Sequence, residues 1–80
     1  MTFLQIEKSL DKMEFDSWDL KLSVANECAW CAELRICVET NPKECDISTV
    51  FFAAGGFGPM EVSRRVHDAC KEWNKKRLQS

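Results

Sequence analysis

The spacing of hydrophobic residues near the N-terminus is that of a helix. Between Thr2 and about Met13, apolar residues recur every three or four positions, as they do on the buried face of an amphipathic helix. Thr2 followed by Gln5 fits a capping box at the start of this helix, and Met1 with Ile6 fits a hydrophobic staple. The sequence therefore predicts a first helix over residues 2–13.

The spacing then changes to alternation, which is typical of strands with one buried face. Apolar and polar residues alternate over Trp18–Val24 and again over a longer stretch from about Cys28 to Thr40. Asn26-Glu27 predicts a tight turn between these two strands, and residues 41–44, which include a proline, predict a loop after the second. β-Branched and aromatic residues predict a third strand over Ile47–Ala54.

The segment Gly55–Pro59 is the clearest break in the chain. Gly58 suits a helix N-cap and Pro59 suits the first helical position, where a missing N–H costs nothing. Glu61 would lie favourably in the positive first turn of a helix that runs to about Arg77. The apolar stripe expected on this last helix consists of Val62, Val66, Ala69 and Trp73, with Cys70 at its flank.

The predicted order of elements is therefore α-β-β-β-α. Because short connections join the three strands, we expect one antiparallel three-stranded sheet with two helices on one face, an arrangement of the α+β class. A chain of 80 residues has room for one domain, residues 1–80, and little room for a deep active-site cleft.

Alternation also decides which side chains leave the predicted sheet on its outward side. Parity places Cys31 and Cys37 outward among charged residues, together with one of the neighbours Phe51 and Phe52. Exposed apolar surface rimmed by charge is typical of a protein interface, and cover by a helix end or loop is the alternative. The two open sheet edges favour a homodimer or strand addition. The residues assigned to a partner-binding site are Asp19, Glu27, Glu33, Arg35, Glu39 and Phe52.

Charge is divided unevenly along the chain. The formal net charge is −2, which argues against strong non-specific binding of nucleic acid. Residues 1–58 carry most of the carboxylates, whereas the last helix is basic. No apolar run reaches the roughly 18–20 residues of a transmembrane helix. The N-terminus has no basic segment followed by an apolar core, so we expect a cytoplasmic protein with reduced thiols and no membrane partner.

Four residues have the spacing of a Cys₃His zinc site. Cys28 and Cys31 have zinc-knuckle spacing, and His67 with Cys70 lies three positions apart on the predicted last helix. A regular strand would point the first two thiols to opposite faces, so we expect small hydrophobic cysteines, no metal and no cofactor. His67 with Cys70 is also the one nucleophile–base pair within a single element, but we expect His67 at the surface and no enzymatic activity. A small zinc or thiol protein stays an alternative.

Two features bear on phosphate and nucleic acid. The glycines that precede the last helix lack the Lys-Ser/Thr pair of a P-loop, which favours a plain strand-to-helix turn. Gly56-Phe57-Gly58 and the α-β-β-β-α order resemble the double-stranded RNA-binding domain, but that family has lysines where this chain has Glu61 and Val62. The alternative nucleic-acid site is one solvent-facing stripe of the last helix, formed by Arg64, Lys71 and Lys75.

In size, acidity and simple α+β architecture the chain resembles the small proteins with which phages and mobile elements block host defence, such as anti-CRISPR proteins. The resemblance rests on general character and on no motif. It implies stoichiometric, non-enzymatic binding to a host protein or nucleic-acid-targeting effector complex. An acidic surface suits this role because it competes for a basic groove. A regulator or adaptor of the same build is the nearest competing interpretation.

Overall fold

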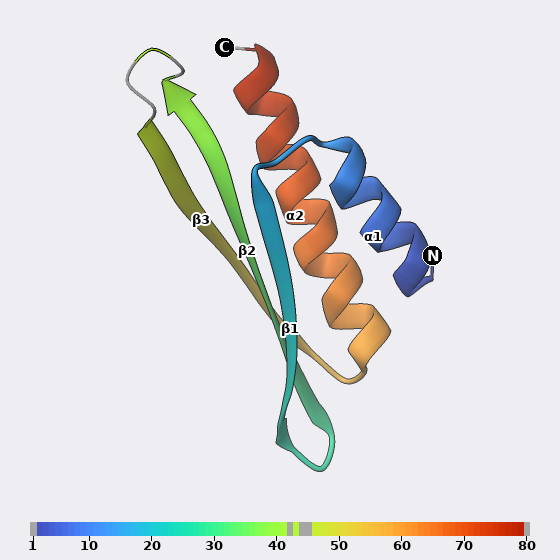
Figure 1. Ribbon diagram of the computed structural model, residues 1–80. Helices are drawn as coiled ribbons and strands as arrows, with labels where there is room; N and C mark the ends of the chain where they lie inside the picture. The colour runs from blue at the N-terminus through green and yellow to red at the C-terminus, as the bar shows by residue number, and fades with distance from the viewer. Residues whose placement is uncertain (1, 42, 44–45, 80) are drawn as a thin grey trace.

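A computed structural model of the chain describes residues 2–41, 43 and 46–79. The elements in chain order are α1 (Phe3–Lys12), β1 (Ser17–Asn26), β2 (Ala29–Asn41), β3 (Asp46–Gly56) and α2 (Pro59–Gln79). The strands form one antiparallel sheet in the order β1-β2-β3, and both helices lie on the same side of it (Figure 1). This confirms the α+β fold and the α-β-β-β-α order.

Helix α1 starts as its sequence indicates. The Thr2 hydroxyl accepts a hydrogen bond from the Gln5 backbone N–H at 3.2 Å, and the Gln5 side chain accepts one from the Thr2 N–H at 2.7 Å. This reciprocal pair is the capping box, which satisfies two N–H groups that a helix start otherwise leaves without partners. Ile6 and Leu10 are fully buried on the inner side of the helix. The staple expected at Met1 lies outside the described residues.

The sheet holds the core of the molecule along β2. Its alternate residues Ala32, Leu34, Ile36 and Val38 are all at most 3% exposed. The β1–β2 turn lies at Glu27–Cys28, one residue later than expected, because the Asn26 side chain accepts a hydrogen bond from the Cys28 N–H at 3.0 Å. Most of the loop expected after β2 lies outside the described residues.

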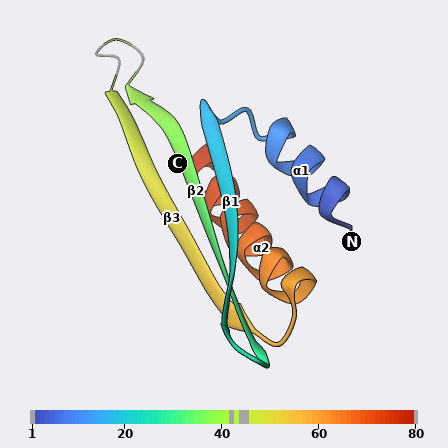
Figure 2. The same ribbon diagram turned by 60° about the horizontal axis from the view of Figure 1, so that its bottom comes forward.

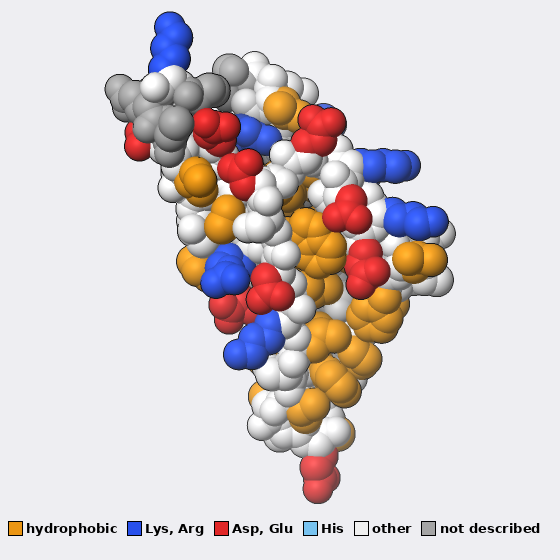
Figure 3. Space-filling view, viewed as in Figure 1, with side chains coloured by type: hydrophobic (Ala, Val, Ile, Leu, Met, Phe, Trp, Pro, Cys, Tyr) orange, Lys and Arg blue, Asp and Glu red, His pale blue; other side chains and the backbone are white. Residues whose placement is uncertain are grey.

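Helix α2 covers the β2 and β3 side of the sheet, and α1 packs on α2 rather than squarely on β1 (Figures 1 and 2). The inward side chains of β1 are consequently less covered than those of β2. Leu20 and Leu22 are half-buried, and Val24 is 57% exposed. Figure 3 shows a stripe of hydrophobic side chains on this side of the molecule. In the described part of the chain, neither helix is long and apolar enough to cross a membrane.

The buried face of α2 differs from the expected stripe. Ala69 is exposed, and His67, which we expected at the surface, is 1% exposed. Ser63 and Asn74 are buried as well, beside the apolar residues Val62, Val66 and Cys70. The reason is that α1 packs against this flank of α2 and covers polar positions that periodicity alone leaves in solvent.

Candidate protein-binding face

The side of the sheet opposite the helices carries the candidate site, which we call the outer sheet face. Across the three strands, Asp19 pairs with Arg35 and Arg35 with Phe51, while Lys21 pairs with Glu33 and Glu33 with Ala53. These rows alternate with the buried rows because successive side chains of a strand point to opposite faces. The outer sheet face consists of Ser17, Asp19, Lys21, Ser23, Cys31, Glu33, Arg35, Cys37, Glu39, Ile47, Thr49, Phe51, Ala53 and Gly55.

Opposite charges lie side by side on this face. Asp19 faces Arg35 across the β1–β2 ladder, and Lys21 faces Glu33 one row further along. Directly opposed unlike charges stabilise antiparallel pairs modestly. Figure 3 shows basic and acidic side chains intermixed over β1 and β2. Together with Glu39, the face carries two cations and three carboxylates, so it has no strong field of either sign.

The aromatic side chain that points outward on this face is Phe51 and not Phe52, the residue that the sequence analysis places in the partner site. Phe51 is 59% exposed and Ile47 is 62% exposed on the outer sheet face. Phe52 is paired with buried Leu34 and points to the helices, where its ring meets Trp73 edge-on at 6.0 Å between centroids. Two adjacent phenylalanines give no parity signal, and the packing against Trp73 decides which of them is inside.

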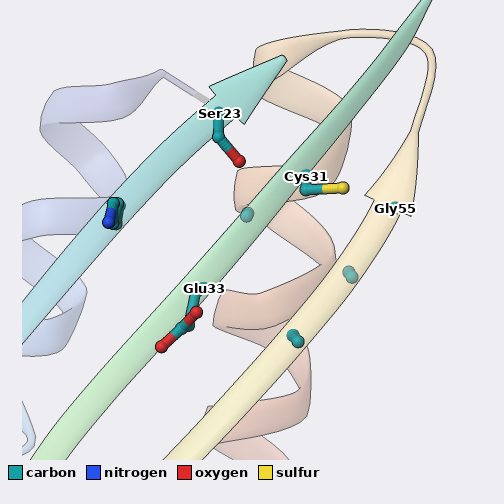
Figure 4. A pocket seen from close by; sticks show the side chains of 8 residues that line it. Ser23, Cys31, Glu33 and Gly55 are labelled. Atoms are coloured by element: carbon teal, nitrogen blue, oxygen red, sulfur yellow. The ribbon is translucent and has the colours of Figure 1, made fainter. Parts of the chain in front are cut away.

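A shallow hollow of about 470 Å³ lies at one end of the outer sheet face (Figure 4). Ser23, Cys31 and Gly55 face one another across the three strands there, and their small size leaves the space. Lys21 and Glu33 flank it. The hollow is therefore a depression in a flat surface, suited to a protruding side chain.

The structure places the expected partner-site residues in three groups. Asp19, Glu33 and Arg35 lie together near the centre of the outer sheet face. Glu39 lies further along β2, paired with Ile47. Glu27 lies apart from these residues, in the β1–β2 turn at the end of the sheet. Ile47 and Phe51, which the sequence analysis does not include among the partner-site residues, also lie exposed on the outer sheet face.

The outer sheet face also carries a thiol with a shifted pKa. Hydrogen bonds with Ser17 and then Thr49 lower the pKa of Cys37, and the nearby Arg35 charge acts in the same direction. The Cys37 Sγ and Thr49 Oγ1 atoms are 3.8 Å apart. These interactions favour the thiolate form of Cys37.

The four residues with zinc-site spacing do not come together. Cys31 is exposed on the outer sheet face, whereas His67 and Cys70 are buried under the opposite face. Burial raises the pKa of Cys70 to about 11, which favours the neutral thiol over a metal-binding thiolate. Over residues 2–41, 43 and 46–79, no three His, Cys, Asp or Glu side chains gather as a metal site.

Ser9, His67 and Asp68 form a chain of polar contacts where α1 packs against α2. His67 Nε2 lies 2.8 Å from Ser9 Oγ, and His67 Nδ1 lies 3.1 Å from an Asp68 carboxylate oxygen. A catalytic triad also needs donors for an oxyanion. Ser9 lies inside α1, where the backbone N–H groups are used by the helix. The Asp68 side chain is 66% exposed. We therefore interpret these contacts as polar interactions that hold α1 against α2.

The residues of the alternative nucleic-acid site are all exposed on α2. Lys71 and Lys75 line a hollow between the helices, and Arg64 does not. The turn before α2 is occupied by the chain's own groups. The Phe57 N–H donates to the Glu61 carboxylate at 3.0 Å, and Arg65 donates to the Gly55 carbonyl at 2.7 Å. A carboxylate thus lies where a phosphate-binding loop would receive its anion.

No family model, curated protein or solved structure matches the chain.

Proposed function

We propose that this protein is a non-enzymatic protein-binding module whose outer sheet face forms the contact with its partner. The observation that carries the proposal is the exposure of Phe51 and Ile47, at 59% and 62%, on a sheet face that neither helix covers. Large apolar side chains rimmed by charge are characteristic of protein interfaces, and aromatic residues are enriched at their centres.

The charge of the face favours a protein over a nucleic acid. Binding to a phosphate backbone depends on an excess of Lys and Arg. The outer sheet face instead has the alternating pairs Asp19–Arg35 and Lys21–Glu33. Such a pattern fits a partner surface that also carries both signs, and it disfavours partners of one sign only.

The resemblance to small anti-defence proteins suggests the class of partner. In that case the partner is a host nucleic-acid-targeting complex, and the module acts by occupying its surface in a fixed stoichiometry. An adaptor or regulator would use the same face on another protein. Both roles require the same contact, so the first experiment addresses the contact itself.

The test is site-specific photo-crosslinking in the native host. A photoreactive phenylalanine analogue at position 51 is expected to give one protein adduct of defined mass. The same analogue at position 57 is the matched control, because Phe57 is 83% exposed but precedes α2 outside the sheet. Arg35→Glu is expected to abolish the adduct, whereas Arg64→Glu on α2 leaves it unchanged.

Once the crosslinked partner is identified and purified, calorimetry measures its affinity for this protein and for its variants. Phe51→Ser is expected to weaken binding at least tenfold in calorimetry, which corresponds to a residue at the centre of an interface, and Phe57→Ser by less than twofold. Crosslinks that arise from position 57 and not from position 51, or equal effects of the two phenylalanine changes on affinity, would contradict the proposal.

A further inference from the structure

A second hollow lies between the helices, and we call it the basic groove. Its volume is about 540 Å³, within the range of small-molecule sites. Lys12 of α1 and Lys71, Lys75 and Arg77 of α2 line it, with Glu14 as an acidic neighbour. The C-terminal ends of both helices lie towards the same end of the molecule, on the helix side of the sheet (Figure 1). The lining residues of the groove come from these ends, and none of them belongs to the outer sheet face.

The C-terminal ends of helices attract cations, so part of the positive charge at the groove neutralises the two helix ends. Each helix C-terminus is equivalent to about half a negative charge, so the two ends together supply about one. Glu14 adds one more. The lysines Lys12, Lys71 and Lys75 exceed this by about one positive charge before Arg77 is counted. Neutralisation of the helix ends therefore does not account for the whole cluster.

The wall of the groove contains a buried amide that is held in one orientation. Asn74 is 7% exposed, and its Oδ1 accepts hydrogen bonds from Arg77 Nε at 3.2 Å and Nη2 at 2.8 Å. Arg77 is itself fixed over the Trp73 ring at 5.5 Å. With Oδ1 engaged, Nδ2 is the donor side of the amide, and within the described residues it has no hydrogen-bond partner. Asn74 therefore offers N–H donors to a ligand.

From these observations, we propose that the basic groove binds a compact phosphorylated small molecule of the nucleotide class. The lysines supply the positive charge. The Asn74 Nδ2 group supplies N–H donors, from which phosphate oxygens accept hydrogen bonds. Met13 and Leu78 line the same groove and give an apolar surface for the rest of the ligand. The chain carries a net charge of −2, so a long nucleic acid would meet repulsive surface beyond the groove, whereas a compact anion would not.

The test uses the intact protein and a fluorescent nucleoside triphosphate. Anisotropy is expected to show saturable binding that unlabelled ATP and pyrophosphate compete for and adenosine does not. Added salt is expected to weaken the binding. Lys71→Gln with Lys75→Gln should raise Kd at least tenfold. The matched control is Lys8→Gln with Lys76→Gln, which removes two exposed lysines of the same helices outside the groove and should change Kd less than twofold.

Amide chemical-shift changes on binding should centre on residues around Lys12 and Lys71–Leu78. The proposal is overturned if no phosphorylated probe binds at millimolar concentration, if adenosine competes as well as ATP, or if the two double variants behave alike. Single-stranded DNA that binds more tightly than the triphosphate and depends on Arg64 would also overturn it, in favour of a nucleic-acid site. Because exposed lysines are changed, loss of folding does not confuse the result, and unfolding curves confirm this.

Discussion

His67 Nε2 lies 2.8 Å from Ser9 Oγ, and this contact between residues 58 positions apart in the sequence joins α1 to α2. The imidazole is 1% exposed, and its other nitrogen meets Asp68 at 3.1 Å. Both ring nitrogens thus have partners, which offsets the cost of burying a polar ring. Ser9→Ala would leave Nε2 without its partner, and we expect the free energy of unfolding to fall by about 1–3 kcal/mol. Urea denaturation measures the change.

The control for this change lies one residue away. Lys8 is exposed on α1, and Lys8→Ala is expected to stay within about 0.5 kcal/mol of the unchanged protein. A double-mutant cycle that combines Ser9→Ala with His67→Ala isolates the coupling between the two side chains. A coupling of zero would mean that the hydrogen bond between Ser9 and His67 does not stabilise the contact between α1 and α2.

The two adjacent phenylalanines of β3 give a direct test of the strand register. Phe52 packs against Trp73 inside, and Phe51 is 59% exposed outside. Phe52→Ala is expected to lower the free energy of unfolding by about 2–3 kcal/mol, less than for a fully buried ring because Phe52 is half-buried. Phe51→Ala should change it by about 0.5 kcal/mol. The reverse ranking would mean that β3 is shifted by one residue.

Much of the sheet could be predicted from alternation. The inward set on β2 follows from strict parity between Trp30 and Val38, and the same parity predicted that Glu33 and Arg35 point outward. Phe51 and Phe52 could not be assigned, because both are aromatic and a shift of one residue exchanges the faces. The decision depends on Trp73, which is distant in sequence and becomes a neighbour only in the folded chain.

The helix side was less predictable. The predicted buried face of α2 was based on the spacing of apolar residues alone. The burial of the polar residues Ser63, His67 and Asn74 was therefore not predicted. Their spacings of four and seven positions match a single helix face, and this pattern was the available signal. The place of α1 beside α2 is a tertiary relationship, and local sequence does not specify it. Lys12 and Arg77 could therefore not be joined with Lys71 and Lys75 in one groove before the structure was known.

The two glycines at the end of β3 differ in the space beside them. A Cβ on Gly56 would lie 2.9 Å from Glu61 Oε2 and 3.1 Å from Val62 Cγ1. The Glu61 carboxylate cannot move freely, because it accepts from the Phe57 N–H and pairs with Arg65 at 2.9 Å. Gly56→Ala is therefore expected to cost about 1–3 kcal/mol in the free energy of unfolding.

Gly55 is the matched control for this substitution. A Cβ there would lie 3.8 Å from the Trp30 carbonyl, an ordinary contact. Gly55→Ala should leave stability unchanged or raise it by a few tenths of a kcal/mol, since alanine restricts the unfolded chain. Thermal denaturation of the two variants provides the comparison. Equal losses for both would show that strand geometry, and not the approach of Glu61, determines the need for glycine.

Cys70 predicts how stability depends on pH in the alkaline range. Burial raises the pKa of its thiol from 9.0 to about 11 in the folded protein. Below about pH 9 the thiol is neutral in both states, so its contribution to stability is fully present. Between about pH 9 and 11 the unfolded chain loses the proton first, which stabilises the unfolded state by at most about 3 kcal/mol. Stability should therefore fall as pH rises through this window.

Comparison with Cys70→Ala separates this effect from the titration of other groups. The variant loses core volume and is expected to be less stable at pH 7 by about 1–2 kcal/mol. Cys37 acts in the opposite direction, since its lowered pKa favours the folded state as pH rises, but it is present in both proteins and cancels. The stability difference between the two proteins, measured in urea from pH 7 to 10.5, should therefore shrink as pH rises. A constant difference would mean that the Cys70 thiolate forms in the folded core as readily as in the unfolded chain, and that burial does not raise the pKa of this thiol.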